Sequence, residues 1–510
     1  MAAWSDGYFT DVQYIAKYFG HLAPANIAFA CLRQGVRPPA FGPGSTYLEL
    51  GCGQGFNLNV MAAANPQIEF RGVDFNPGQI ANAQRLSRDA RLANIAFEDL
   101  SFEQVLALPA GRLPQFDIIA LHGVISWVSP ENRALIVQIL DRHLKPGGAV
   151  IVTYNGLPAW AAMLPLQRFV KAHFDRGTGE PKARALAAFR AAQDMVDRGA
   201  QGFAGPRIAA RVKSALTSDP AYLIHEYFND HFHPLYHAEV ARELGAARLT
   251  FAASSGISED MPGLAVTEQL RELVEQEADP VRRQSLLDYA SDRQFRREIF
   301  VRGPNALGPL ERGQMLRDVR FSLMRPPSQV SLDFKIPIGK LTGDPQTYGA
   351  VMDALADGPR SFAELRELSP LKALSEAALV KMLGLLLEVA AIHPADQSAG
   401  DVAPGKALNR QLAQRFLLGD TASHVAAPAA GTGVSVGFTE LLALSGISEE
   451  KRDHRATARQ GWELLRQSNS RLQKDGRALS NQAEHEAELI KRLEKFDTDK
   501  LPLFQRLGVI

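Results

Sequence analysis

The sequence predicts an α/β fold, a doubly wound and mostly parallel sheet followed by a mainly helical C-terminal region. Residues 46–50 have the apolar composition of a buried strand and run directly into alternate glycines. Strand and helix patterns then alternate to about residue 155, which implies right-handed crossovers. Beyond residue 303, helical spacing of apolar residues dominates. With 510 residues, the chain should form two or three domains.

Gly51, Gly53 and Gly55 predict a tight turn between the first strand and a helix. Glycine adopts positive φ and lets a ligand approach the backbone closely. Glu49 stands on the strand before this turn, and Asp74 ends the second strand, about 20 residues further on. A carboxylate at that distance suits the two hydroxyls of a ribose. Because acids flank the turn and no G-K-[ST] is present, we expect a cationic or neutral ligand.

Five short motifs in chain order resemble those of class I S-adenosylmethionine (SAM)-dependent methyltransferases. They are residues 49–55 (ELGCGQG), 71–74 (RGVD), 97–100 (FEDL), 116–123 (FDIIALHG) and 144–148 (LKPGG). The resemblance implies a Rossmann-like, seven-stranded methyltransferase sheet with SAM as cofactor at the carboxyl ends of its strands. A dinucleotide enzyme or a structural domain without ligand is the alternative.

The resemblance assigns the SAM contacts to the strand ends. The three glycines would approach the amino-acid end of SAM, and Glu49 would act through the turn or on the ligand's ammonium. The other assignments are Asp74 to the ribose hydroxyls, Phe75 to one adenine face, Asp99 to the adenine amine with the Leu100 N–H nearby, and His122 and Gly123 to the methionine part. Asp99 has a competing role as a cap of the next helix.

The candidate catalytic residues on the acceptor side are Trp127, Tyr154, His231, His233 and Tyr236. Trp127 follows the fourth strand and Tyr154 ends the fifth, where a ring face would attract a cation; core packing is the alternative for Trp127. The others belong to a run of four His, three Tyr and two Phe in sixteen residues. Its histidines could take a proton from an amine, or the run packs an insertion on the sheet. A metal site is disfavoured, since the run has no cysteine and no H-E-x-x-H spacing.

Residues 222–302 resemble the methyltransferase regulatory domain. That module accompanies class I domains in bacterial proteins that include lysine methyltransferases of outer-membrane proteins. The matching residues are 225–227 (HEY), 234–237 (PLYH) and 293–296 (RQFR). The resemblance implies a protein substrate with a lysine acceptor, such as an outer-membrane protein before export.

The predicted division of the chain has six parts. They are an N-terminal helical cap (1–44), the SAM-binding core (45–156), a helical insertion over the substrate side (157–245), the last two strands of the sheet (246–303), a linker with a winged-helix-like domain (304–400) and a C-terminal helical region (401–510). In the winged unit the second helix carries only Lys381 as a cation, which favours a protein contact or structural role over nucleic-acid binding.

Two smaller segments carry expectations of their own. Residues 11–35 are predicted as one helix, or as two that break at Pro24, with Tyr14 and Tyr18 packed on the sheet or over the cleft. Residues 426–437 are small and are predicted to form a loop.

Composition limits the remaining classes. Lys+Arg and Asp+Glu both total 56, and a chain without net charge is not expected to bind nucleic acid generally. Cys31 and Cys52 are the two cysteines, which fits a reducing compartment and predicts a cytoplasmic protein. We expect no signal peptide and no membrane span, because no basic start precedes an apolar core and no run of 18 apolar residues occurs.

Together these features predict a SAM-dependent methyltransferase that acts on lysine side chains of a protein. The alternative enzyme is a small-molecule O- or N-methyltransferase. The alternative from another class is a SAM-binding sensor or pseudo-enzyme, in which the C-terminal part is the effector. A homodimer is one expected assembly.

Overall fold

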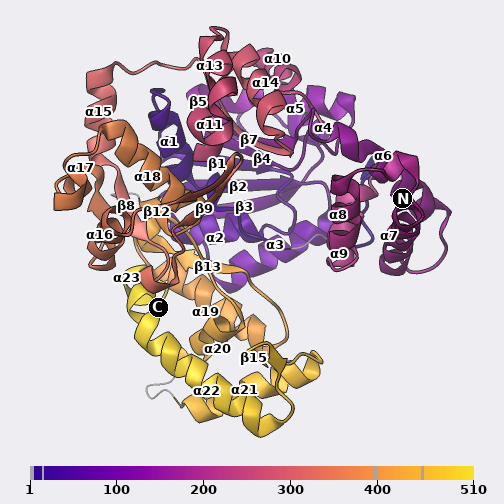
Figure 1. Ribbon diagram of the computed structural model, residues 1–510, viewed down its shortest axis with the longest axis vertical. Helices are drawn as coiled ribbons and strands as arrows, with labels where there is room; N and C mark the ends of the chain where they lie inside the picture. The colour runs from indigo at the N-terminus through magenta and orange to yellow at the C-terminus, as the bar shows by residue number, and fades with distance from the viewer. Residues whose placement is uncertain (1–4, 14–15, 396–399, 449–452) are drawn as a thin grey trace.

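A seven-stranded sheet forms the centre of the molecule (Figure 1), in a computed structural model that describes residues 5–13, 16–395, 400–448 and 453–510. Its strand order is β3-β2-β1-β4-β5-β7-β6, and β7 runs antiparallel to both of its neighbours. The strands are β1 (Thr46–Leu50), β2 (Glu69–Asp74), β3 (Ile95–Asp99), β4 (Phe116–His122), β5 (Leu144–Asn155), β6 (Leu249–Ser254) and β7 (Phe295–Arg302). This arrangement confirms the predicted fold class.

Alternate residues of the central strands enter two separate apolar cores, as the two-residue period of a strand requires. Ile118 and Ala120 of β4 face one core, and Ile119 and Leu121 face the other. The first core takes α1 (Pro24–Arg33), α2 (Phe56–Ala64) and α3 (Pro77–Asp89); the second takes α4 (Phe102–Ala107), α5 (Pro130–His143) and α10 (His237–Gly245). The central strands are therefore buried on both faces.

Several helices begin as their sequences predict, with proline in the first turn. Asn76 caps α3, and its side-chain oxygen accepts from the N–H groups of Gly78 and Gln79. Ser129 caps α5 by accepting from the Asn132 N–H. These caps fix where the chain leaves β2 and β4, next to the predicted site.

Helices fill both connections around β6. Between β5 and β6 lie η3 (Ala161–Met163), α6 (Leu164–Arg176), α7 (Pro181–Asp197), η4 (Gln201–Phe203), α8 (Pro206–Ala215), α9 (Pro220–Tyr227) and α10. The helices α6–α9 enclose an apolar core of their own. Between β6 and β7 lie α11 (Ile257–Asp260), α12 (Pro262–Ala265), α13 (Glu268–Gln276) and α14 (Pro280–Ser291), which the sequence analysis did not anticipate.

A winged-helix-like unit follows the sheet. Its elements are α15 (Pro309–Asp318), β8 (Arg320–Leu323), η5 (Pro327–Gln329), β9 (Asp333–Ile336), β10 (Gly339–Thr342), α16 (Pro345–Ala356), β11 (Arg360–Ser361), α17 (Phe362–Arg366), η6 (Ser369–Leu371), α18 (Glu376–Glu388) and β12 (Ile392–Ala395). A small sheet in the order β11-β8-β12 joins its helices.

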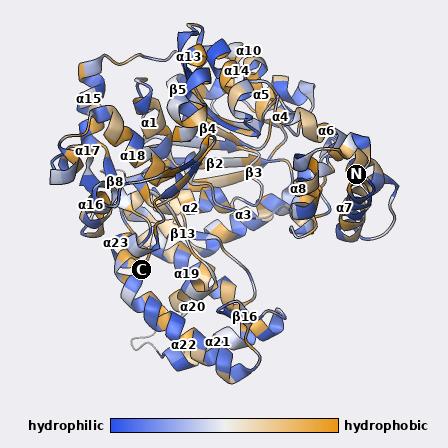
Figure 2. Cartoon of the chain, in the orientation of Figure 1, coloured by the Kyte–Doolittle hydropathy of each residue, from blue (hydrophilic) through white to orange (hydrophobic). Residues whose placement is uncertain are grey.

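The C-terminal region is mainly helical, with α19 (Ala403–Leu417), α20 (Phe438–Ser445), η8 (Gly446–Ser448), α21 (His454–Gln467), α22 (Gln482–Asp499) and α23 (Leu501–Arg506). Figure 2 shows hydrophilic and hydrophobic residues interleaved along α21 and α22. The apolar side of α22 is buried through Leu489, Leu493 and Phe496. A short hairpin, β15 (Gln473–Lys474) and β16 (Arg477–Ala478), separates these two helices.

The predicted loop at 426–437 is wrong. Residues 426–435 belong to a hairpin formed by β13 (His424–Ala427), η7 (Pro428–Ala430) and β14 (Thr432–Ser435), which packs on α2. Small residues are required by the close contact, since a Cβ at Gly433 would lie 3.0 Å from both Tyr18 and Val60.

The predicted helix before Pro24 is also wrong for the described residues 11–13 and 16–23. The structure has a short 3-10 turn, η2 (Gly20–Leu22), and the helix begins at Pro24. Residues 16–19 are not helical, and Asn57 accepts the Phe19 N–H there. Contacts with the sheet domain thus replace the local hydrogen bonds of a helix. Tyr14 lies outside the described residues.

No helix in the described part of the chain combines the length and the apolar character needed to cross a membrane.

Candidate active site

The glycine turn after β1 adopts the backbone that its sequence predicts. Gly51, Gly53 and Gly55 have φ values of 72°, 54° and 63°, in the left-handed region that favours glycine. A Cβ at Gly51 would lie 2.6 Å from Val124, which follows β4. At Gly55 it would lie 2.5 Å from Ala83 of α3. Glycine therefore lets β1, α3 and the end of β4 converge around one turn.

Asp74 at the end of β2 holds the glycine turn. Its two carboxylate oxygens accept the N–H of Gly53 at 2.8 Å and the N–H of Asn76 at 2.9 Å. Burial raises the pKa of Asp74 to about 6, although these backbone hydrogen bonds oppose the rise. Each oxygen keeps a further lone pair, so the carboxylate can also accept a ligand hydroxyl.

Asp99 pairs with Asp74 in the register of β2 and β3, which places both acids at one edge of the sheet. Asp99 is exposed. The helix-cap alternative for it is wrong, because Ser101 caps α4 and forms a capping box with Gln104. The Leu100 N–H, predicted to lie near the adenine, donates to the Asp74 carbonyl oxygen at 3.1 Å.

Phe75 is half-buried at the same edge of the sheet. The ring of Tyr8, from the N-terminal segment, meets it edge-on with 5.9 Å between centroids. Phe75, the predicted neighbour of the adenine, thus contacts another aromatic side chain.

Glu49 is the deepest acid of the site, with 4% of its surface exposed. Asn57 donates to its carboxylate at 3.3 Å, and no Lys, Arg or His of the described residues forms an ion pair with it. Burial raises the pKa of Glu49 to about 8; the Asn57 hydrogen bond opposes this rise and Asp74 adds to it. A buried acid without a cation suits a ligand that brings its own positive charge.

His122 ends β4 within an enclosed cluster. The Thr153 hydroxyl lies 3.0 Å from His122 Nδ1 and accepts the Gly123 N–H at 2.8 Å. Phe19 lies against the imidazole with 3.8 Å between ring centroids, and His21 Nε2 lies 3.3 Å from Nδ1.

Burial, reinforced by Arg297, lowers the pKa of His122 to about 3. Phe19, His21 and Thr153 were missed by the sequence analysis. No motif marks them, because they meet His122 only through contacts between distant parts of the chain.

The candidate catalytic residues do not come together. Trp127 packs against Phe232 with 4.7 Å between ring centroids, inside the core of the α6–α9 insertion. Tyr154 is fully buried on the opposite side of the sheet from α1–α3, and its hydroxyl donates to Glu298 at 2.6 Å. Tyr236 is the N-cap residue of α10 and stacks on Tyr289.

His231 and His233 face each other with 6.0 Å between ring centroids, and the His233 N–H donates to the Ser126 carbonyl oxygen. Across the residues that the structure describes, no three His, Cys, Asp or Glu side chains are grouped to hold a metal ion.

Residues 222–302, here called the regulatory segment, contain a buried ionic network that also contacts β5. Glu298 of β7 accepts from Tyr154, from His237 at 2.7 Å and from Arg296. Arg296, only 1% exposed, also binds Asp288 of α14 and Gln284. This network ties α10 and α14 to the carboxyl end of β5.

Comparison with known proteins agrees with this geometry. Residues 48–150 match the methyltransferase domain family, and residues 219–302 match the family described as a predicted methyltransferase regulatory domain. An uncharacterized protein of Synechocystis sp. is 32% identical over 511 residues, covering 99% of each chain. Trans-aconitate 2-methyltransferase of Methylobacterium nodulans is 30% identical over 117 residues, 23% of this chain and 40% of that enzyme.

Among solved structures, PKMT2 from Rickettsia typhi in complex with AdoHcy has the same fold. The TM-score is 0.66 with 18% identity, and the match covers 98% of this chain and 99% of the other. The acidic strand ends, the glycine turn and these matches lead to one conclusion: the chain belongs to the SAM-dependent methyltransferases that carry a methyltransferase regulatory domain.

Proposed function

We propose that this methyltransferase transfers methyl groups from SAM to lysine side chains of a protein. The observation that carries the proposal is the extent of the structural match. PKMT2 shares the winged-helix-like and C-terminal regions as well as the donor domain, since the match covers 98% of the chain. The trans-aconitate enzyme matches 23% of it. Regions beyond the donor domain favour a polypeptide acceptor over a metabolite.

The donor site fits SAM through its acids. SAM supplies an activated methyl group on a sulfonium, so the protein needs only to align donor and acceptor and keep the acceptor unprotonated. We propose that Glu49 faces the ammonium of the donor, because this buried acid lacks a cation among the described residues. Asp74 would accept the ribose hydroxyls, and Asp99 the adenine amine.

The neighbouring aromatic and histidine residues would shape the donor cleft. Phe75 and Tyr8 offer ring faces near the adenine position. Gly123 has φ 63° and no atom within 4 Å of an added Cβ, which leaves room beside the methionine part. His122 would border that part as a neutral imidazole, because burial and the nearby Arg297 disfavour the charged form of its side chain.

The roles on the acceptor side remain proposals, and for two of these residues we propose a structural role in place of a catalytic one. Tyr154 would act by holding Glu298 and the end of β5, because its hydroxyl is already engaged. Trp127 would support the insertion against Phe232. His231 and Tyr236 would border the entering polypeptide from the start of α10 and the preceding turn.

Four finer expectations belong to this proposal. An outer-membrane protein before export is the proposed acceptor, following the resemblance of the regulatory segment. A reducing compartment such as the cytoplasm is proposed, because Cys31 and Cys52 are both free and buried. We also propose a homodimer and the six-part division of the chain given above.

Radiolabelled SAM tests the proposal. The protein is incubated with methyl-labelled SAM and a lysate, and the label is followed into protein and into small molecules. We expect label in protein, on methyllysine after complete hydrolysis. Label confined to small molecules would establish the metabolite alternative, and SAM binding without any transfer would establish the sensor.

A further inference from the structure

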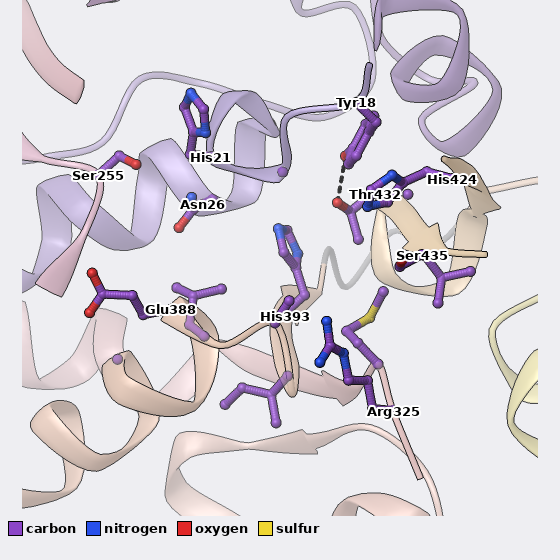
Figure 3. A pocket seen from close by; sticks show the side chains of 18 of the residues that line it. Tyr18, His21, Asn26, Ser255, Arg325, Glu388, His393, His424, Thr432 and Ser435 are labelled. Carbon is purple, nitrogen blue, oxygen red and sulfur yellow. Dashed lines mark hydrogen bonds between the residues drawn. The ribbon is translucent and has the colours of Figure 1, made fainter. Parts of the chain in front are cut away.

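A chamber of about 540 Å³ opens beside the proposed donor site, within the roughly 300–1,000 Å³ typical of ligand pockets. Its walls come from α1, the β6–α11 turn, the winged-helix-like unit, the β13–β14 hairpin and α23. Figure 3 shows His21 on one side of this space and Arg325 on the other, with His393 between them. Segments from the N-terminal and C-terminal parts of the sequence therefore share one cavity.

His21 lies between the chamber and the proposed methyl-donor position. This residue lines the cavity, and its Nε2 lies 3.3 Å from His122 Nδ1. Arg297 lines the same wall and pairs in register with Thr153, the partner of His122. His21 and Arg297 thus place the cavity next to the carboxyl ends of β4 and β5, where acceptors of this sheet type meet their donors.

Buried polar groups on the chamber wall lack partners in the protein. Arg33 is 8% exposed, and its Nε and Nη1 have no hydrogen-bond partner among the described residues. The same holds for Ser255 Oγ and Asn26 Oδ1, on side chains that are each 4% exposed. Such groups are costly to bury, so a polar ligand that reaches them would gain affinity.

The free charge in the chamber is positive. Arg33, Arg297, Arg325 and Lys500 line it, against Glu388 as its only lining acid in the described chain. Glu388 already accepts from Ser258 and faces Arg297 at 3.7 Å.

The four cations differ in how far acids compensate them. Glu259 pairs with Arg297, and Glu440 accepts from Lys500 at 2.6 Å. Arg33 meets Asp260 only at 3.7 Å. Arg325 is exposed and forms no hydrogen bond or ion pair with another described residue. Arg325 is therefore the least compensated of the four, and Arg33 still offers the N–H groups of Nε and Nη1.

We propose that the chamber binds an acidic side chain of the polypeptide substrate, next to the lysine that is methylated. This inference rests on the proposed protein-lysine function and names the sequence context that it selects. The carboxylate would meet Arg325 at the rim and Arg33 at the wall, while the lysine reaches past His21.

Two synthetic peptides test the proposal with the full-length protein. Both carry one central lysine, flanked by glutamates in one peptide and by the isosteric glutamines in the other. We expect kcat/KM to be about tenfold higher for the glutamate peptide, and the ratio to fall in high salt. Arg325→Glu should remove or invert this preference, while Arg366→Glu, on α17 away from the chamber, should keep it.

The results test the acidic-context inference and the proposed lysine methylation separately. Equal rates on the two peptides would overturn the acidic-context inference and leave lysine methylation standing. An unchanged glutamate preference in Arg325→Glu would also overturn it, provided that circular dichroism shows the variant folded. Failure of the wild type to methylate any peptide or protein would overturn the proposed function, and the inference with it.

Discussion

The hydroxyls of Tyr18 and Thr432 share a buried hydrogen bond of 2.6 Å, although 414 positions separate them in the sequence. Phe19, the next residue, is held by Asn57 and lies on His122. The N-terminal segment is therefore placed between the donor site and the β13–β14 hairpin. The C-terminal region supports the site through this contact.

Removing that hydrogen bond should weaken both the fold and donor binding. In Tyr18→Phe the Thr432 hydroxyl, 1% exposed, loses its partner. We expect the free energy of unfolding to fall by about 1–3 kcal/mol and the affinity for SAM to decrease, since Phe19 is released. Urea unfolding and calorimetry measure the two effects.

Tyr348→Phe is the matched control, because Tyr348 is 8% exposed and has no hydroxyl hydrogen bond to another described residue. Its unfolding free energy should change by less than about 0.5 kcal/mol. If Tyr18→Phe behaved like this control, the hairpin would not support the site through Thr432.

Sequence reasoning succeeded where neighbouring strand ends bring residues together. Asp74 and Asp99 end adjacent parallel strands, so their proximity follows from the fold class. Glu49 and His122 follow in the same way from β1 and β4. Local patterns were sufficient for these positions.

Sequence reasoning failed where contacts between residues far apart in the chain determine the structure. Residues 16–19 carry helical spacing but are straightened by Asn57 and the hairpin. The orientation of Tyr154 depends on Glu298, 144 positions away. His21 meets His122 only because the N-terminal segment crosses the strand ends. Composition and periodicity contain no signal for such pairs.

Asp74→Ala should weaken SAM binding. The variant loses the proposed ribose acceptor and also frees the Gly53 and Asn76 N–H groups that order the turn. We expect the dissociation constant to rise by about tenfold or more, measured by calorimetry. Glu69→Ala, an exposed position on the same strand, should bind SAM as the wild type does. Equal affinity in the two variants would contradict the ribose assignment.

SAM binding should release a proton from Glu49. The pKa of Glu49 is about 8 in the ligand-free protein, and a bound cation would favour its ionised form. Affinity should therefore rise with pH up to about 8 and then level off. Calorimetry in buffers of different ionisation enthalpy reports the released proton. Glu49→Gln should show no release; a release of the same size in this variant would place the titrating group elsewhere.

Glu49 also affects folding in the opposite direction. Because its folded pKa exceeds the ordinary value of 4.5, the folded protein binds more protons than the unfolded chain between these values. The ligand-free protein should therefore lose stability as pH rises from about 5 to 8. Glu49→Gln should lose less over the same range. Urea unfolding at several pH values gives the comparison.

Glu298 should show the reverse dependence, because its pKa is low. Burial alone would raise that pKa, but Arg296, His237 and Tyr154 bring it from 4.5 to about 2. Its stabilisation is present above pH 4.5 and disappears as pH falls toward 2.

Glu298→Gln at neutral pH leaves Arg296 buried with Asp288 as its remaining acid. We expect a loss of about 3–5 kcal/mol in unfolding free energy and a weaker acid dependence than in the wild type. Glu268→Gln, whose side chain is 78% exposed, should change neither quantity. If Glu298→Gln lost stability in acid as steeply as the wild type, other carboxylates would cause the acid sensitivity. The buried network would then not be what holds β5 to the regulatory segment.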